Sequence, residues 1–358
     1  MEKVPFISII IPCRNEEKYI GKCLDSIMFN VYPRNKMEVL VIDGKSDDTT
    51  KDIISKYMKK YSFIQILDNP DYNVPTALNI GIRTAKGDII VRLDAHNVYS
   101  KNYLEKCVKY LQVYKINNVG GRWITLPGNN TKVAKSIALA LSHPFGVGNA
   151  YFRIDGLKNP KFVDTVPFGC YRRDLFNKIG FFNEHLVRNQ DLEFNLRLKS
   201  AGGKILLAPD IVSFYYARSN FKDLFKQNFL NGYWIINSLK YAKLPFSIRH
   251  LIPFIFITSL LISFSIFIAY SPLFYFFVII LLSYCFVNIF FSYKLCHRKS
   301  LKILPFISIT FSILHFSYGY GSIYGIIKLI IYKLEELCLK TLKDISSILK
   351  RVEQNLKY

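Results

Sequence analysis

The sequence predicts an α/β domain with a mostly parallel sheet, followed by transmembrane helices. Two observations carry this prediction: isoleucine-rich runs alternate with helical stretches near the N-terminus, and residues 251–293 carry no charged side chain. Short continuous apolar runs are typical of strands that are buried on both faces of a sheet. An apolar run of about 20 residues is long enough to cross a bilayer.

Strands and helices alternate from the first residues onward. Strands are expected at Phe6–Pro12, Met37–Asp43, Phe63–Leu67 and Asp88–Leu93, with helices at residues 19–29, 46–61 and 75–86. This order predicts crossover connections and a doubly wound parallel sheet. From about residue 120 the pattern loosens, and the Gly-Gly pairs at 120–121 and 202–203 indicate turns.

Two apolar runs, Leu251–Ile268 and Leu273–Phe291, are long enough to span a membrane and meet at a turn at Tyr270–Pro272. Basic residues lie at the outer ends of this hairpin: Arg249, His250, Lys294, His297, Arg298 and Lys299. The positive-inside rule therefore predicts an integral membrane protein whose N-terminal domain is cytoplasmic.

The remaining C-terminal segments leave alternatives open. Residues 303–332 form a third apolar stretch, interrupted by Gly319, Gly321 and Gly325, that either spans the membrane or is partly re-entrant. Residues 219–240 are aromatic and basic, and they form either a helix along the membrane interface or an ordinary helix packed on the domain. The tail from Leu334 is amphipathic and basic.

The net charge of +22 favours anionic partners. The basic residues do not form one dense patch with interleaved aromatic residues, so the membrane lipid explains this charge better than nucleic acid does. The seven cysteines are odd in number and scattered, which indicates reduced thiols.

Polar side chains follow three of the predicted strands, and ligands of such sheets bind beyond the carboxyl ends of the strands. Asp43 could accept hydrogen bonds from a base or ribose, while Ser46 and Asp47 could equally cap the next helix. Asp94 and His96 could hold a divalent cation against a diphosphate, although Asp-x-His alone usually marks a turn. Carboxylates suit Mg²⁺ or Mn²⁺, and an imidazole shifts the preference towards Mn²⁺.

Two further segments could carry chemistry. Asp191 precedes a predicted helix and could be a general base, or a carboxylate that the helix dipole favours. The loop Pro12–Glu16 could bracket a nucleobase, or it could be a plain polar loop.

Taken together, these segments resemble the family 2 glycosyltransferases with the GT-A fold. The segments Ser8–Glu16, Asp43–Thr49 and Arg92–His96 occur in that family's order. Further segments resemble the succinoglycan-type branch of exopolysaccharide glucosyltransferases: 69–70, 75–81, 145–150, 163–169 and 188–191. The resemblance covers roughly residues 5–240 together with the C-terminal hydrophobic segments.

The resemblance implies an inverting transfer from a nucleotide sugar, expected to be a UDP-sugar. It implies Asp191 as the catalytic base and Asp94 with His96 as ligands of Mn²⁺ or Mg²⁺. Its donor residues are Pro12, Arg14, Glu16, Asp43 and Asp94, and its acceptor-side residues are Asp164, Phe168, Gly169, Gln190, Gln227 and Trp234. Processive relatives carry Gln-x-x-Arg-Trp near Gln227 and Trp234, and the missing arginine favours addition of a single sugar. His96 replaces a second aspartate, which leaves the identity of the metal open.

These inferences divide the chain into four regions. Residues 1–120 form the nucleotide-sugar-binding half and 121–248 the acceptor-side half with an interfacial helix; 249–332 form the transmembrane region and 333–358 the amphipathic basic tail. The acceptor is expected to be a lipid-linked glycan or a polysaccharide. A polyprenyl-phosphate sugar synthase and a non-catalytic, membrane-tethered nucleotide-binding protein are the alternatives. A transporter is disfavoured because the hairpin carries no charge.

Overall fold

The computed structural model describes residues 4–241, 248–269, 274–297 and 300–355. The chain divides into two compact units. Unit 1 comprises Met1–Leu224 and Leu282–Leu314, and unit 2 comprises Phe225–Leu281 and His315–Tyr358. Unit 1 contains the sheet, and the described part of unit 2 is helical.

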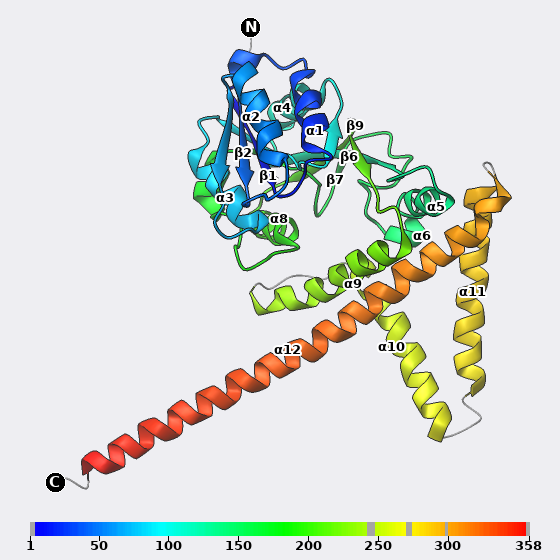
Figure 1. Cartoon of the computed structure of the whole chain (residues 1–358). Coiled ribbons are helices and arrows are strands. Elements are labelled where there is room, and N and C mark those ends of the chain that lie inside the picture. The colour runs from blue at the N-terminus through cyan, green and yellow to red at the C-terminus, as the bar shows by residue number, and fades with distance from the viewer. Residues whose placement is uncertain (1–3, 242–247, 270–273, 298–299, 356–358) are drawn as a thin grey trace. The chain divides into compact units, whose positions relative to one another are not determined.

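Unit 1 is built on one mixed sheet with the strand order β3-β2-β1-β4-β8-β6-β9-β5, and β7 pairs with β9 (Figure 1). The strands are β1 (Ile7–Cys13), β2 (Met37–Asp43), β3 (Ile64–Asp68), β4 (Ile89–Arg92), β5 (Asn97–Tyr99), β6 (Asn118–Leu126), β7 (Lys161–Phe162), β8 (Cys170–Arg172) and β9 (Ile205–Tyr216). The four predicted strands are parallel to their neighbours among β1–β4. β8 lies between β4 and β6 and is antiparallel to both, so the parallel part ends at β4.

The helices of unit 1 follow the predicted pattern closely in its first half. They are α1 (Ile20–Met28), α2 (Thr50–Lys60), α3 (Val74–Thr84), α4 (Tyr103–Val113), α5 (Lys132–Ala140), α6 (Pro144–Val147), α7 (Asp174–Ile179) and α8 (Gln190–Ser200), with a 3₁₀ turn at Arg34–Lys36. The second helix was expected to begin at Ser46 and instead begins at Thr50, because Ser46 bonds to the carboxylate of Asp43.

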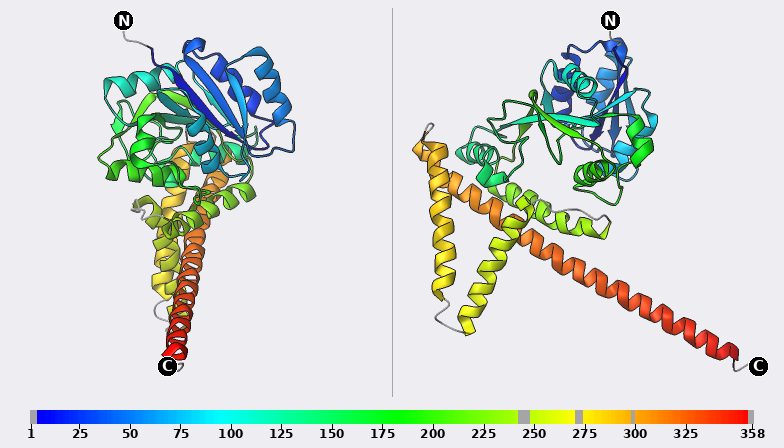
Figure 2. Two further views of the ribbon diagram at one scale, coloured as in Figure 1. Left: turned by 90° about the vertical axis from the view of Figure 1, so that its left-hand side faces the viewer. Right: turned by 180° about the vertical axis from the view of Figure 1, so that it is seen from behind.

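The sheet carries a separate hydrophobic core on each face. Figures 1 and 2 show the helices that cover the sheet. Alternate residues of β1 contribute to different cores: Ile9 and Ile11 belong to the first core, and Ile10 belongs to the second. The first core includes residues of α1, α2 and α4, and the second includes residues of α3, α7 and α8. Residues buried on both faces explain why β1 reads as a continuous apolar run.

The predicted turn at Gly120–Gly121 is wrong, because both residues lie inside β6. The pairing of β6 with β9 shifts register between Gly121 and Arg122. A Cβ on Gly121 would collide with the carbonyl group of Ile211, so glycine serves a close backbone approach at a bulge.

A third core in unit 1 joins the sheet domain to segments from the apolar C-terminal region. It contains Ile137 and Ala140 of α5, Tyr215 of β9, and Ile307 and Phe311. The last two belong to α12 (Leu304–Asn355), and Cys296 of α11 (Phe274–Cys296) joins the same core. Parts of two apolar helices therefore complete the core of unit 1.

Around this core, the aromatic rings of α6 pack on the same two helices. The ring of Phe145 lies 4.9 Å from that of Phe291 and 4.9 Å from that of Phe311. His143 lies 5.2 Å from Phe291, centroid to centroid. Ser136 Oγ and Thr310 Oγ1 add a buried hydrogen bond of 3.0 Å.

Unit 2 consists of α10 (Ile248–Ala269) and parts of α9 (Phe221–Asn237), α11 and α12, with a 3₁₀ turn at Ser238–Lys240. α9 and α12 cross closely at two glycines. A Cβ on Gly232 would collide with the carbonyl oxygen of Tyr318, and a Cβ on Gly321 would collide with that of Phe229. Small residues permit such close helix approach.

Among the described residues, three helical segments are long and apolar enough to cross a membrane: Arg249–Ile266, Phe274–Cys296 and Leu301–Leu342. The proposed break at Gly319, Gly321 and Gly325 is wrong, because α12 is one continuous helix of 52 residues and its glycines serve packing. The predicted turn at Tyr270–Pro272 and the basic residues Arg298 and Lys299 lie outside the described residues.

Candidate active site

The loops that follow β1 and β2 are tied together at the carboxyl edge of the sheet. The amide of Asn15 donates to Ser46 Oγ over 2.9 Å, and the amide of Asp47 donates to Asn15 Oδ1 over 3.0 Å. The amide of Glu16 donates to Thr50 Oγ1 over 2.8 Å. Asn15 has a φ of 54°, in the left-handed region that asparagine tolerates. These bonds hold the two loops in register with each other.

Asp43 ends β2, and its side chain is fully buried. Its Oδ1 accepts from the Ser46 hydroxyl over 2.5 Å, and its Oδ2 accepts from the Ser46 amide over 3.0 Å. Lys51 Nζ lies 3.2 Å from Oδ2. Asp43 therefore organises the loop before α2, and its contact with uracil stays a prediction.

A cationic and aromatic surface lies beside these loops. The guanidinium carbon of Arg14 lies 4.6 Å from the centroid of the Tyr72 ring, and Lys45 Nζ lies 5.0 Å from the same centroid. Tyr72 is 46% exposed. An exposed ring between two cations suits the stacking of a base and the attraction of a phosphate. Pro12 lies further back, inside β1 and beside Ile42.

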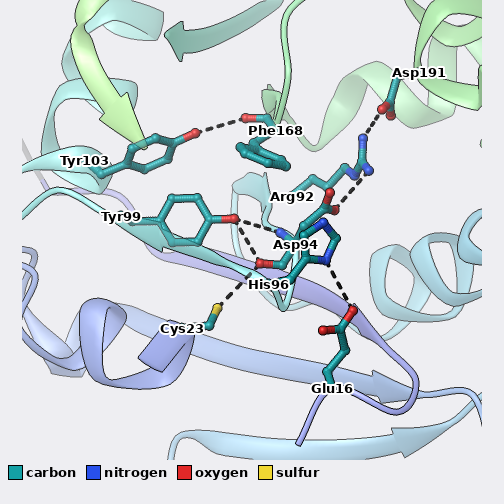
Figure 3. A network of polar contacts seen from close by, with 9 residues as sticks. All are labelled: Glu16, Cys23, Arg92, Asp94, His96, Tyr99, Tyr103, Phe168 and Asp191. Atoms are coloured by element: carbon teal, nitrogen blue, oxygen red, sulfur yellow. Dashed lines mark hydrogen bonds and ion pairs between the residues drawn. The ribbon is translucent and has the colours of Figure 1, made fainter. Parts of the chain in front are cut away.

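Three charged side chains form a linear ion triad (Figure 3). Arg92, which is 6% exposed at the end of β4, donates from Nη2 to Asp94 Oδ1 over 3.0 Å. Its Nη1 donates to Asp191 Oδ2. The backbone of Asp94 is also fixed, because its amide donates to the Tyr99 hydroxyl over 2.8 Å. One buried guanidinium therefore sets the distance between the carboxylates predicted to serve the donor and the acceptor.

Asp191 lies in the first turn of α8, just after Asn189, which has a φ of 63°. Its Oδ2 is held by Arg92, whereas its buried Oδ1 has no hydrogen-bond partner among the described residues. Burial and the nearby Asp94 raise the pKa of Asp191, while Arg92 opposes that rise. A carboxylate with one anchored oxygen and one unused oxygen has the geometry of a base.

His96 lies near the other end of the triad. Its Nδ1 is 3.2 Å from Glu16 Oε1. Burial lowers the pKa of His96, but the hydrogen bond to Glu16 and the charge of Asp94 outweigh that effect and raise it. A carboxylate at Nδ1 leaves Nε2 to face a metal ion, which is a common arrangement for histidine ligands.

The side chains at the carboxyl edge of the sheet supply only some of the ligands that a divalent cation needs. No group of three or more His, Cys, Asp or Glu side chains with metal-binding geometry occurs in the described parts of the chain. Asp94 and His96 would therefore supply two ligands, and substrate phosphates and water would supply the rest, which is usual for Mg²⁺ in nucleotide-dependent enzymes.

The predicted acceptor-side residues belong to several elements of the fold. Gln190 is buried beside Asp191 in α8, and the carbonyl of Gly169 accepts from the amide of Arg92 over 3.0 Å. Phe168 is buried, and its ring lies 5.7 Å from that of Tyr99. Asp164 forms an exposed ion pair with Lys199. Gln227 and Trp234 lie on α9 in unit 2.

Sequence reasoning gave no role to Arg92, although it lies within one of the quoted motifs. Arg92 follows the apolar residues Ile-Ile-Val of a buried strand, and a charged residue in that position requires buried partners of opposite charge. This feature of the sequence could have indicated its role. Sequence reasoning also gave no role to Trp123, Arg153 and Tyr215. Arg153 stacks on both rings, with its guanidinium carbon 4.3 Å from the Trp123 centroid.

Known proteins are similar to this chain in sequence. Residues 8–180 match the sequence profile of glycosyl transferase family 2. A dolichyl N-acetyl-alpha-D-glucosaminyl phosphate 3-beta-D-2,3-diacetamido-2,3-dideoxy-beta-D-glucuronosyltransferase from Methanococcus voltae is 36% identical over 265 residues, which cover 72% of this chain and 80% of the relative. The succinoglycan biosynthesis protein ExoA from Rhizobium meliloti is 27% identical, over 68% of this chain and 73% of that protein.

Solved structures support the fold. The mannosyltransferase PcManGT from Pyrobaculum calidifontis, solved with GDP-Man and Mn²⁺, superimposes with a TM-score of 0.57 at 15% identity, over 91% of this chain and 88% of that one. This likeness shows the GT-A fold. The matching family profile and the relative at 36% identity establish that the chain belongs to glycosyl transferase family 2 and is a glycosyltransferase.

Proposed function

We propose that this glycosyltransferase moves a single sugar from a UDP-sugar to a lipid-linked acceptor, with inversion at the anomeric carbon. The ion triad is the observation that carries this proposal. It fixes a donor-side carboxylate, Asp94, and a candidate base, Asp191, on opposite sides of one buried guanidinium. A single displacement needs a leaving group and an attacking hydroxyl on opposite sides of one carbon.

In the proposed step, Oδ1 of Asp191 takes the proton from the acceptor hydroxyl. The hydroxyl oxygen then forms a bond to the anomeric carbon while the bond from that carbon to the diphosphate breaks. The nucleoside diphosphate departs, and Asp191 later returns its proton to solvent. Arg92 acts as a positioning residue, because it holds Oδ2 and so aims Oδ1.

The donor would bind over the tied loops and the Arg14–Tyr72 surface. Asp94 and the Nε2 of His96 would hold a divalent cation, which supplies charge neutralisation to the diphosphate. One structure supports this expectation, since PcManGT was solved with Mn²⁺. Mn²⁺ and Mg²⁺ both remain candidates.

The name of the Methanococcus voltae relative supports a lipid-linked acceptor, because it specifies a dolichyl-phosphate-linked sugar. The apolar helices also support such an acceptor, since an enzyme held in the bilayer meets lipid-linked glycans directly. The absence of the Gln-x-x-Arg-Trp arginine between Gln227 and Trp234 supports addition of one sugar.

A donor screen tests the proposal. Purified full-length protein would be incubated with radiolabelled UDP-sugars and GDP-mannose, in the presence of a polyprenyl-phosphate-linked N-acetylglucosamine. We expect transfer from a UDP-sugar and a product one sugar longer, with the opposite anomeric configuration. Transfer to bare polyprenyl phosphate would favour a synthase, and UDP binding without transfer would contradict the proposal.

Removal of the metal tests the proposed ligands. Excess chelator should abolish transfer, and Asp94→Ala should lose it even when Mn²⁺ is added. His96→Asp should stay active and shift its preference from Mn²⁺ towards Mg²⁺, because a carboxylate is the harder ligand. Full activity in chelator would disprove the metal requirement.

The membrane orientation is also a proposal. We propose that the hairpin α10–α11 makes the protein integral and that residues 1–248 lie in the cytoplasm, because basic residues flank the hairpin on one side. Alkaline carbonate should leave the protein in the membrane fraction. Single cysteines placed on the surface of the N-terminal domain should not react with an impermeant reagent in intact cells. Reaction from outside would reverse the orientation.

A further inference from the structure

One asparagine of α3 holds the segment that leads into α8 and Asp191. Asn79 lies in the middle of α3 and is 1% exposed. Its Nδ2 donates to the carbonyl of Phe182 over 2.9 Å, and its Oδ1 accepts from the amide of the same residue over 3.0 Å. Nδ2 also donates to Glu184 Oε1 over 2.7 Å. Both N–H bonds and the oxygen of this buried amide are therefore used on one short segment.

The helix that carries Asn79 packs closely on the sheet. A Cβ on Gly81, two residues further along α3, would lie 2.6 Å from Cγ2 of Ile10 and 2.9 Å from Cδ1 of Ile42, so a methyl group there would collide with the strands β1 and β2. Such a close approach leaves α3 little freedom to move. Asn79 therefore ties the segment before α8 to the same sheet that carries Arg92.

The packing continues from this segment into α8. The ring of Phe182 stacks on that of Phe194 in α8, with centroids 4.5 Å apart. From the same helix, Arg197 donates from Nη2 to the carbonyl of Phe181 over 2.8 Å. This segment and α8 are therefore packed together, and Asp191 is the second residue of that helix.

The position of Asp191 matters because a general base must lie within hydrogen-bond reach of the proton that it takes. A displacement of about 1 Å can lower a rate about a hundredfold. Arg92 holds only one end of this side chain, Oδ2, so the position of Oδ1 also depends on where α8 begins. A support for the start of α8 therefore affects the reaction as well as the fold.

We propose that Asn79 is a positioning residue for sugar transfer. Its three hydrogen bonds fix the start of α8, and this aims Oδ1 of Asp191 at the acceptor hydroxyl. The inference rests on the proposed function, in which Asp191 is the base. Asn79 acts through Asp191 and is not itself a catalytic residue.

The kinetic constants of the full-length protein in detergent test the proposal. Asn79→Ala should lower kcat roughly ten- to hundredfold, because the base is displaced, while the donor KM and UDP binding stay unchanged. Asn30→Ala is the matched control, since Asn30 is also buried and its Nδ2 donates to the carbonyl of Ser100 over 3.0 Å. It should lower Tm by a similar amount and leave kcat near that of the wild type. A normal kcat in Asn79→Ala, or equal losses of kcat in both variants, would overturn the proposal.

An exchange of partners sharpens this test. Asn79→Asp keeps an oxygen for the amide of Phe182 but sets a carboxylate against Glu184, so its kcat should fall. Adding Glu184→Gln supplies an amide donor to that carboxylate and should recover at least part of the loss. A double variant whose kcat is no higher than that of Asn79→Asp would contradict the proposed role of this contact.

Hydrogen exchange tests the same contact without transfer. In Asn79→Ala the backbone amides of residues 182–191 should exchange about tenfold faster than in the wild type, and those of β1 should not change. Faster exchange that stops before Gln190 would show that Asn79 does not hold the start of α8, and the proposal would fail. If the wild type binds UDP but transfers no sugar, the proposed function fails, and the exchange measurement still decides whether Asn79 fixes this helix start.

Discussion

The donor loops and the ion triad place their charged side chains in different ways. In the loops after β1 and β2, hydrogen bonds between neighbouring segments hold the backbone, and both oxygens of Asp43 are used. In the triad, one arginine joins carboxylates from segments 97 positions apart, and one oxygen of Asp191 stays unused. The loops are a preformed support, whereas the triad keeps a reactive group available.

The largest effect on kcat is expected when the unused oxygen of Asp191, Oδ1, is changed. Asp191→Asn should reduce kcat by about a hundred- to ten-thousand-fold, because the amide cannot take the proton of the acceptor hydroxyl. UDP binding, measured by calorimetry, should be unchanged. Asp174→Asn is a matched control, since Asp174 also lies in the first turn of a helix and is exposed. Near-normal turnover of Asp191→Asn would remove it from the reaction.

The next largest effect is expected on the pH dependence of kcat when Arg92, which joins the two carboxylates of the triad, is replaced. Because Arg92 lowers the pKa of Asp191, Arg92→Met should raise that pKa, so that the base becomes protonated at a higher pH. The acid limb of the kcat profile should therefore move to higher pH by roughly one to three units, the usual effect of a neighbouring cation. Arg92→Lys should move it less.

The control for this measurement is Arg83→Met, which removes an exposed arginine that stacks on Phe181. An acid limb that stays in place in Arg92→Met would show that a group other than Asp191 governs the profile.

A smaller effect, on the donor KM, is expected for substitutions in the loops after β1 and β2, because several hydrogen bonds hold each of these loops. Asp43→Asn keeps an acceptor atom but loses the charge that faces Ser46 and Lys51. A hydrogen bond to a charged group contributes about 1.5–3 kcal/mol, so the donor KM should rise about tenfold or more while kcat changes little. Asp25→Asn, which removes the charge of an exposed carboxylate that accepts from the Tyr57 hydroxyl, should leave the donor KM unchanged. A loss in kcat alone would contradict the supporting role.

The smallest effect is expected at the exposed edge of the donor surface. Tyr72→Ala removes the ring beneath Arg14, and exposed cation–π contacts contribute about 0.5–1 kcal/mol. The donor KM should rise about two- to fivefold, and Tyr72→Phe should restore it. A loss of activity in Tyr72→Ala as large as that in Asp191→Asn would contradict the distinction between residues that hold the donor and the residue that takes part in the reaction.

The same contrast explains what the sequence could predict. The strands β1–β4 and the carboxylates at their ends could be located, because doubly buried strands and the polar residues that follow them are local patterns. The start of α2 could not be located, since Ser46 bonds backwards to Asp43 instead of capping the helix.

The ion triad could not be predicted from local sequence patterns, because the contact between Arg92 and Asp191 depends on the packing of α8 on the sheet. Phe194 and Leu198 of α8 belong to the second core, and this packing places Asp191 beside Arg92. The same limit applies to Gly120–Gly121, whose role depends on the approach of Ile211.

The third core has a consequence for how the protein is made. Leu282–Leu314 belong to the same compact unit as the sheet, yet the ribosome adds them after all the strands. Until this segment is synthesised, the nascent chain lacks part of the apolar packing that surrounds Ile137, Ala140 and Leu141 in the finished protein. Completion of the catalytic domain therefore depends on the part of the chain that contains the apolar helices α11 and α12. A chain shortened near Lys240 should fold its sheet, bind chaperones for longer and aggregate.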